Sequence, residues 1–291
     1  MLKQNQKLYE ELKKNMRISI SNIAWETTDD EQVCEILHHY GIDAIDIAPG
    51  KYFADFDKAT SEEIASVRTW WYERGIEIIG MQSLLYGTKG LNIFSDENVQ
   101  QRMLDHLQEV CRIGDGLNSR KLVFGSPLNR DRAGLSDKEA FEKGTLFFQR
   151  LAKVAQRHEV IICLEPNPEC YGSNFMTSAS ETAAVVEAVG YRSIRMQYDT
   201  GAISINGESP SMICSKFRNM IGHIHASEPH LKPLGTGSTD HEKYAATLRK
   251  FLPNYPVTIE MLTKKNKGTL DTIKTSIEYV VDFYGSRKEE S

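Results

Sequence analysis

Four short stretches of the sequence each carry an apolar run that ends on a residue able to bind a metal ion. They are I-I-C-L-E at residues 161–165, M-Q-Y-D at 196–199, H-I-H at 223–225 and V-T-I-E at 257–260. Short apolar runs of this kind are typical of buried parallel strands. The predicted strands therefore end on four candidate ligands, Glu165, Asp199, His225 and Glu260.

Three carboxylates and one imidazole form a donor set that suits a divalent metal ion. Oxygen-rich ligation with one nitrogen favours Mn²⁺, Mg²⁺ or Co²⁺, and we predict Mn²⁺ first, with Zn²⁺ as a further alternative. Taken singly, an acidic residue at a strand end commonly caps a helix or forms a salt bridge, and a strand histidine such as His223 is commonly hydrogen-bonded in a core. The recurrence of four such residues at one structural position favours the metal site.

The elements that must position these residues alternate between strand and helix patterns. Strands are predicted at residues 17–25, 44–48, 76–82, 121–125, 161–165, 193–199, 221–225 and 256–260. Helices are predicted at 28–41, 61–75 (with a Ser61 cap), 96–117, 136–158, 178–189, 210–219, 241–252 and 268–284. Eight such units predict an α/β fold, a single-domain (β/α)8 TIM barrel whose strand ends meet at one face. A doubly wound open sheet is the alternative, but it needs no eighth unit and no G-x-G-x-x-G follows the first strand.

The domain prediction assigns residues 1–15 to a short N-terminal extension or helix, 16–286 to the barrel and 287–291 to a solvated tail. The loop 83–95 carries apolar residues that suggest a lid or a homodimer interface, among them Leu84, Leu85, Tyr86, Leu91 and Phe94.

Composition narrows the classes of function. The chain has 291 residues, of which 40% are hydrophobic and 26% charged, with a net charge of −5. This acidic balance, without a long basic run, argues against nucleic acid and against an anionic membrane surface. The five cysteines are an odd number without C-x-x-C spacing, the N-terminus is too polar for a signal peptide, and no apolar run reaches the length of a membrane span. We therefore predict a cytoplasmic protein with a small-molecule ligand.

The segments L-E-P, Y-D-T-G, H-I-H-A-S-E and T-I-E-M resemble the sugar phosphate isomerase/epimerase family, which has a xylose-isomerase-like TIM barrel. Their order and spacing are most similar to the ketose 3-epimerase pattern. The resemblance implies a metal-dependent isomerase or epimerase that forms an enediolate by proton abstraction next to a carbonyl. It also implies that Glu165 and Glu260 flank a sugar or sugar derivative, one removing the proton and the other returning it.

Three positions depart from that pattern. Ala202 stands where the 3-epimerases have a histidine, Leu231 where they have an arginine, and Tyr171 where they have a second glutamate. These departures predict a different substrate with the same metal chemistry. Candidate substrate contacts are Gln82, Asn167, Tyr171 and Glu228 for hydroxyl groups, and Lys232 and Arg130 for a phosphate or carboxylate.

The same ligand set serves several outcomes, and the sequence leaves them open. Protonation from the opposite face gives epimerisation, transfer to the adjacent carbon gives isomerisation, and loss of a β-hydroxyl gives dehydration of a keto-sugar or cyclitol. A non-catalytic carbohydrate-binding barrel is a further alternative. The endonuclease IV branch of the superfamily is disfavoured, because it needs more histidines at the strand ends and the chain is acidic.

Overall fold

The strands of the chain form a closed parallel barrel in sequence order, β1 to β8. The computed structural model describes residues 16–264 and 268–285, so the predicted extension 1–15 and tail 287–291 lie outside the described residues. Parallel pairing of Ile18 with Val257 joins β1 to β8. The strands are β1 (Ile18–Ser21), β2 (Ala44–Ile47), β3 (Glu77–Met81), β4 (Lys121–Phe124), β5 (Ile161–Leu164), β6 (Ile194–Asp199), β7 (Ile221–Ser227) and β8 (Val257–Glu260). The predicted (β/α)8 barrel is confirmed.

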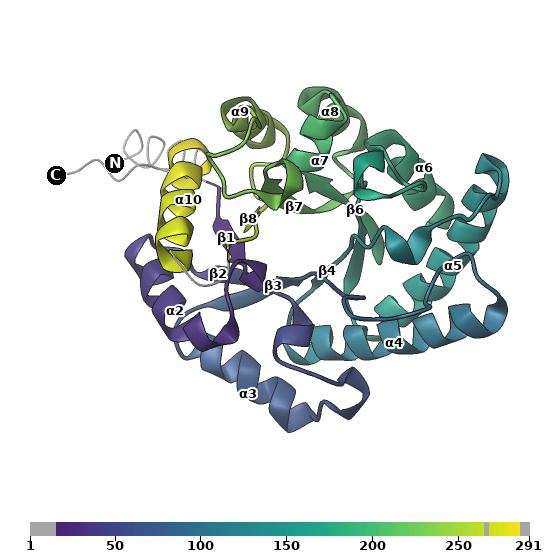
Figure 1. The fold of residues 1–291 in the computed structure, drawn as a ribbon, viewed down its shortest axis with the longest axis horizontal. Helices are drawn as coiled ribbons and strands as arrows, with labels where there is room; N and C mark the ends of the chain where they lie inside the picture. The colour runs from purple at the N-terminus through teal and green to yellow at the C-terminus, as the bar shows by residue number, and fades with distance from the viewer. Residues whose placement is uncertain (1–15, 265–267, 286–291) are drawn as a thin grey trace, which may run out of the picture. The chain divides into compact units, whose positions relative to one another are not determined.

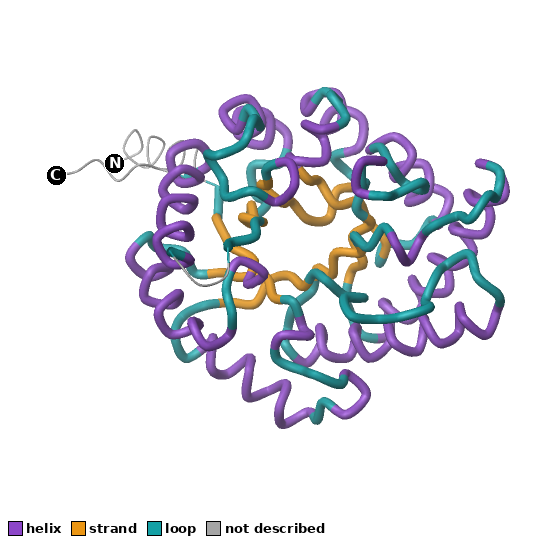
Figure 2. The backbone as a smooth tube through the Cα atoms, viewed as in Figure 1, coloured by secondary structure: helices purple, strands orange, loops and turns teal. Residues whose placement is uncertain are grey.

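Helices separate the successive strands along the chain, as the colour sequence of Figure 1 and the alternation of strand and helix in Figure 2 show. The α-helices are α2 (Asp30–His39), α3 (Ser61–Tyr72), α4 (Glu97–Gly116), α5 (Asp137–Arg157), α6 (Ala179–Val189), α7 (Thr200–Ile205), α8 (Pro210–Phe217), α9 (His241–Phe251) and α10 (Thr269–Tyr284). Across residues 16–264 and 268–285, no helix combines the length and the apolar character that crossing a membrane requires.

Contacts group the chain into two compact units. One contains Met1–Ala44, Asp199–Arg218 and Ile224–Ser291, as far as these are described, and the other contains Ile45–Tyr198 and Asn219–His223. Three of the four predicted ligands belong to the first unit, and Glu165 belongs to the second. The contacts of each predicted ligand are therefore described within the unit to which it belongs.

Side-chain caps explain where the helices of the second unit begin. Asp96 caps α4 by accepting hydrogen bonds from two backbone N–H groups, and Ser136 caps α5 in a capping box with Glu139. The predicted Ser61 cap is wrong by one residue. Thr60 has the extended backbone of a cap and exchanges hydrogen bonds with Glu63, so Ser61 is the first residue of α3.

Three boundaries near the C-terminal ends of the strands differ from the prediction. The strand β7 continues past the predicted end at His225 to Ser227, so His225 lies two residues inside the strand. The first strand stops at Ser21, because the Ser21 side chain accepts a hydrogen bond from the Ile23 backbone N–H and starts a 3-10 turn. The short helix α7 follows β6 directly, where a loop was expected. Its sequence, T-G-A-I-S-I, contains glycine and β-branched residues that favour helix only weakly, so its formation depends on contacts outside the helix.

Several apolar side chains of the loop 83–95 pack inside the protein. Leu84, Leu85 and Phe94 are buried, whereas Tyr86 is 89% exposed. The Asn129 backbone carbonyl accepts a hydrogen bond from Ile93, which ties the loop to the segment after β4. Most of the apolar surface that suggested a lid or a dimer interface is thus covered by the chain itself.

Candidate metal centre

Glu165 directly follows β5 and keeps the ladder geometry of that strand. Its backbone N–H donates to the carbonyl of Phe124 on β4, and the Arg130 Nη1 atom donates to its carbonyl oxygen at 2.7 Å. The carboxylate accepts a hydrogen bond from the Asn167 amide, with 2.9 Å between Nδ2 and Oε2. It lies over Gly125, where a Cβ atom would overlap the carboxylate. The backbone and side chain of Glu165 are therefore both fixed.

Asp199 is the last residue of β6 and also the N-cap of α7. Its Oδ1 atom accepts a hydrogen bond from the Ala202 backbone N–H at 2.6 Å, and its Oδ2 atom accepts one from the Ser227 hydroxyl at 2.6 Å. The residue is buried. Capping by Asp199 supplies part of the stabilisation that the weak helix sequence of α7 lacks.

His225 and Glu260 lie on the neighbouring strands β7 and β8. The Nδ1 atom of His225 is 3.2 Å from Oε2 of Glu260, and both side chains are buried. In the strand register His225 is the partner of Thr258, and Ser227 is the partner of Glu260. An imidazole nitrogen and a carboxylate oxygen are therefore presented together from two adjacent strands.

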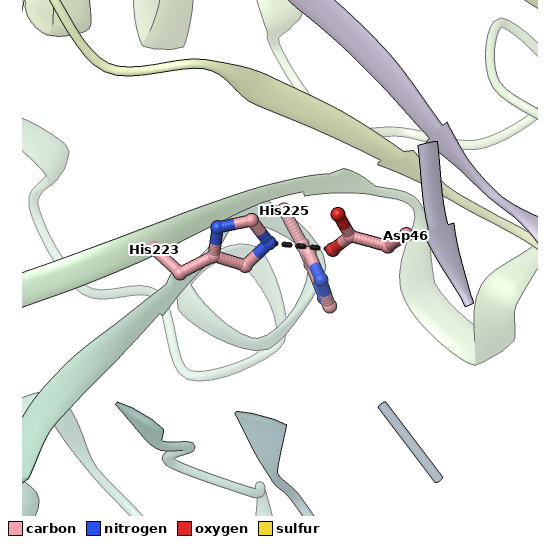
Figure 3. A group of neighbouring side chains, drawn as sticks. All are labelled: Asp46, His223 and His225. Atoms are coloured by element: carbon pink, nitrogen blue, oxygen red, sulfur yellow. Dashed lines mark hydrogen bonds and ion pairs between the residues drawn. The ribbon is translucent and has the colours of Figure 1, made fainter. Parts of the chain in front are cut away.

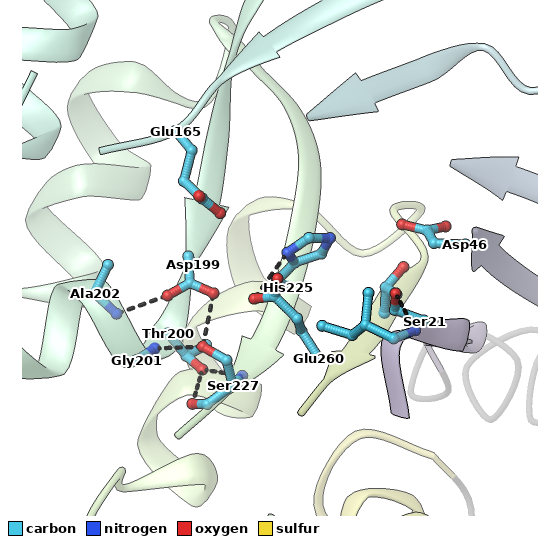
Figure 4. Close-up of polar contacts among 12 residues, drawn as sticks. Ser21, Asp46, Glu165, Asp199, Thr200, Gly201, Ala202, His225, Ser227 and Glu260 are labelled. Atoms are coloured by element: carbon cyan, nitrogen blue, oxygen red, sulfur yellow. Dashed lines mark hydrogen bonds and ion pairs between the residues drawn. The ribbon is translucent and has the colours of Figure 1, made fainter. Parts of the chain in front are cut away.

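Three of the four predicted ligands lie together within the first unit. One donor atom each from Asp199, His225 and Glu260 can be chosen so that all three lie within 4.8 Å of one another. Figure 4 shows Glu260 beside His225, and Asp199 with the hydrogen bonds that hold its carboxylate. Consecutive strands of a parallel barrel bring their carboxyl ends together, which explains this convergence.

The electrostatics of the centre fit a cation. Burial, and after it the charge of Glu260, raise the pKa of the Asp199 carboxyl to about 6. The charge of His225 and the hydrogen bonds that Asp199 accepts lower this pKa, but by less. Carboxylates that repel each other in a buried site are stabilised by a shared divalent cation. The three oxygen donors and one nitrogen donor would hold such an ion with hard or borderline character.

A second buried pair contains His223, which precedes His225 by two residues. The Nε2 atom of His223 is 2.6 Å from Oδ2 of Asp46 on β2, and both side chains are buried (Figure 3). Because Asp46 and His223 contact each other directly, we interpret them as a hydrogen-bonded core pair.

Two predicted substrate contacts are held inside the protein by other groups. Arg130 is fully buried and donates to the backbone of Glu165, and burial lowers the pKa of its guanidinium to about 10. Glu228 is buried, and its Oε2 atom accepts a hydrogen bond from the Thr239 backbone N–H at 3.0 Å, while Oε1 is 3.6 Å from Nε2 of His241. Arg130 thus holds the backbone of Glu165, and Glu228 holds the backbone at Thr239.

The other predicted contacts have varied positions. Asn167 is buried and binds the Glu165 carboxylate, so it belongs to the centre. Gln82 is buried at the end of β3, where its backbone N–H donates to Ile47. Tyr171 is half-buried in a 3-10 turn, and Lys232 is exposed after β7. Their contact with a substrate remains a prediction.

Sequence reasoning missed Ser227 and Asp46. Ser227 follows His225 by two residues, and this alternation in a strand places both side chains on one face. Asp46 interrupts the otherwise apolar stretch A-I-D-I-A, and a charged residue in such a stretch requires a buried partner. Both signals were present in the sequence.

A match to a known protein family agrees with the barrel fold. Residues 34–282 match the model of the xylose isomerase-like TIM barrel family. The chain belongs to this family.

Similar proteins include sugar epimerases. An L-ribulose 3-epimerase from Methylomonas sp. (strain DH-1) is 28% identical over 134 residues, which are 45% of this chain and 46% of that protein. The match thus spans about half the length of that curated relative. The structure of a D-psicose 3-epimerase with D-tagatose from Clostridium cellulolyticum H10 superposes with a TM-score of 0.76 at 18% identity, covering 93% of this chain and 100% of the other. That of an L-ribulose 3-epimerase has a TM-score of 0.74 at 17% identity and covers 93% of each chain. At these identities the structural likeness establishes the fold.

Proposed function

We propose that the chain is a divalent-metal-dependent epimerase or isomerase that acts on a sugar or sugar derivative. The observation that carries this proposal is the grouping of donor atoms of Asp199, His225 and Glu260 within 4.8 Å in the first unit. Glu165 is the fourth ligand in this proposal. Membership of the xylose isomerase-like family and the likeness to ketose 3-epimerases support the same conclusion.

The proposed roles follow from the local contacts. Glu165 and Glu260 exchange a proton with a substrate carbon next to a carbonyl, one as the base and the other as the acid. The Asn167 amide donates to one oxygen of Glu165 and so fixes the orientation of that carboxylate. Asp199 and His225 complete the ligand set without a role in proton transfer. A bound divalent cation supplies Lewis acidity toward the substrate oxygens.

The metal identity is part of the proposal. Three carboxylates and one imidazole favour Mn²⁺, with Mg²⁺, Co²⁺ and Zn²⁺ as competitors. A cytoplasmic location and a homodimer remain predictions from the sequence.

The substrate differs from a free ketohexose in this proposal. Ala202 uses its backbone N–H to cap α7 through Asp199, and the Leu231 carbonyl accepts a hydrogen bond from Leu262. Neither side chain can replace the histidine or arginine of the ketose 3-epimerase pattern as a polar contact. A keto-sugar or cyclitol from which water is lost would use the same proton abstraction, so dehydration is the second candidate.

The test begins with metal-free protein reloaded with Mn²⁺, Mg²⁺, Co²⁺ or Zn²⁺. Each form is incubated in D₂O with ketoses, keto-sugars and sugar phosphates, and the products are followed by NMR and mass spectrometry. We expect metal-dependent deuterium incorporation at one carbon with an inverted or rearranged product. Loss of 18 Da instead identifies the dehydratase. Binding without any exchange identifies a carbohydrate-binding barrel and contradicts catalysis.

A further inference from the structure

Ser227 is a buried hydroxyl at the end of β7, two residues beyond the candidate ligand His225. Its side chain reaches the junction between β6 and α7, where Asp199 lies (Figure 4). Its backbone is paired in register with Glu260 of β8. Ser227 therefore adjoins three candidate ligands: it hydrogen-bonds Asp199, follows His225 by two residues and pairs in register with Glu260. Ser227 itself is not a candidate ligand.

The direction of the hydrogen bonds at Ser227 is fixed by chemistry. The Gly201 backbone N–H can only donate, so Oγ of Ser227 accepts it at 3.0 Å. The hydroxyl hydrogen is then directed to Oδ2 of Asp199 at 2.6 Å, because a carboxylate only accepts. The Ala202 N–H holds the other oxygen, Oδ1. Both oxygens of Asp199 are thus oriented while each keeps a lone pair for a cation.

The backbone around this hydroxyl is clamped separately. The Thr200 hydroxyl donates to the carbonyl of Ser227 and accepts from its backbone N–H, both at 2.8 Å. Gly201 permits the close approach, because a Cβ atom there would lie 2.6 Å from Oγ of Ser227. Replacement of the Ser227 hydroxyl therefore leaves the Thr200 clamp in place, and its effect can be separated from a general loosening of the strand.

We propose that Ser227 is a positioning residue that orients the Asp199 carboxylate for the metal ion and thereby sets the metal affinity of the centre. The proposal rests on the metal site of the proposed function. Groups that hydrogen-bond a ligating side chain fix its orientation, and their removal typically lowers metal affinity by about 10–100-fold.

The experiment compares Ser227→Ala with Ser193→Ala. Ser193 is also a buried serine, and it precedes β6, but its hydroxyl donates to the Ala152 carbonyl. Mn²⁺ affinity is measured by titration calorimetry of the metal-free full-length proteins, and Co²⁺ absorption bands report the ligand geometry. We expect Ser227→Ala to weaken Mn²⁺ binding about 10–100-fold and to change the Co²⁺ bands. Ser193→Ala should bind like the wild type.

A second variant covers the case in which Ser227→Ala fails to fold. Ser227→Cys keeps a weaker donor of similar size and should bind Mn²⁺ with intermediate affinity. Wild-type affinity in every folded Ser227 variant overturns the positioning role but leaves the metal site intact. Absence of Mn²⁺, Mg²⁺, Co²⁺ and Zn²⁺ binding in the wild type overturns the metal site itself, and with it this role.

Discussion

His225 directs its Nδ1 atom at the carboxylate of Glu260, 3.2 Å from Oε2. The two residues stand on adjacent strands, and the register sets them diagonally, since His225 is level with Thr258 and Ser227 with Glu260. A diagonal pair of long side chains can meet across a parallel ladder. Nδ1 of His225 and Oε2 of Glu260 are close enough to bind one cation together, as the proposed function requires.

Metal binding should stabilise the protein only while this pair is intact. At a Mn²⁺ concentration about 100 times the dissociation constant, binding to the folded state alone adds about 2.7 kcal/mol. We expect a higher melting temperature of the wild type with Mn²⁺, reversed by a chelator, and no Mn²⁺-dependent change for His225→Ala. An equal shift in both proteins would place the stabilising ion elsewhere.

The two glutamates should be needed for proton transfer. Glu165→Gln and Glu260→Gln retain side-chain shape but remove the acid or base, which lowers rates by about 10²–10⁴-fold for each such group. The measurement is solvent deuterium exchange into the substrate at saturating metal, so that weaker metal binding is compensated. Glu187→Gln, on an exposed position of α6, serves as the control and should retain wild-type exchange.

Asp46 and His223 should contribute strongly to stability. Removing one partner of a buried hydrogen bond typically costs about 1–3 kcal/mol, so Asp46→Ala should lower the free energy of unfolding by that order. Gly80→Ala should also destabilise, because the added Cβ would overlap the Asp46 carboxylate. Gly50→Ala, which has open space around it, is the matched control in urea unfolding. A similar effect of both glycine substitutions would contradict the contact.

Stability should fall at acidic pH in part through His241. Burial lowers the pKa of this imidazole, against the opposing charge of Glu228. The unfolded chain then takes up a proton, near pH 6.5, more readily than the folded chain does. The contribution of His241 to the free energy of unfolding is therefore complete above about pH 6.5 and is lost as the pH decreases below that value.

The corresponding measurement is urea unfolding between about pH 7.5 and 5.5 for the wild type and His241→Gln. The variant should lose less stability over this interval, because it lacks the group that protonates on unfolding. Tyr284, whose hydroxyl is 2.9 Å from Nδ1 of His241, provides a check, since Tyr284→Phe keeps the imidazole and should keep the pH dependence. Equal pH dependence in the wild type and His241→Gln would refute the assignment.

The strand ends could be predicted because one physical rule positions them all. Apolar runs become buried parallel strands, and a closed barrel brings their carboxyl ends together, so the sequence places Glu165, Asp199, His225 and Glu260 at or near the ends of their strands. Their role as metal ligands stays a prediction. The starts of the helices predicted at 96–117 and 136–158 were similarly accessible, because their caps, Asp96 and Ser136, bond to residues only three positions away.

Features set by distant contacts were not accessible from the sequence. Arg130 lies in a polar stretch that reads as exposed loop, yet it is fully buried under the backbone of Glu165. Glu228 was predicted to contact the substrate, and the structure adds that its buried carboxylate lies next to Thr239 and His241. The helix α7 escaped prediction because its own propensity is weak and its stability comes from Asp199 at its first turn.

Asp199 is both the N-cap of α7 and a proposed metal ligand, so the first turn of α7 should respond to metal binding. The carboxylate that would hold the ion is also the acceptor for the Ala202 backbone N–H. Any rotation of that carboxylate, whether on loading or on loss of the ion, must lengthen or shorten this one hydrogen bond. The chemical shift and exchange rate of the Ala202 amide proton should therefore report whether a metal ion is bound, without an added label.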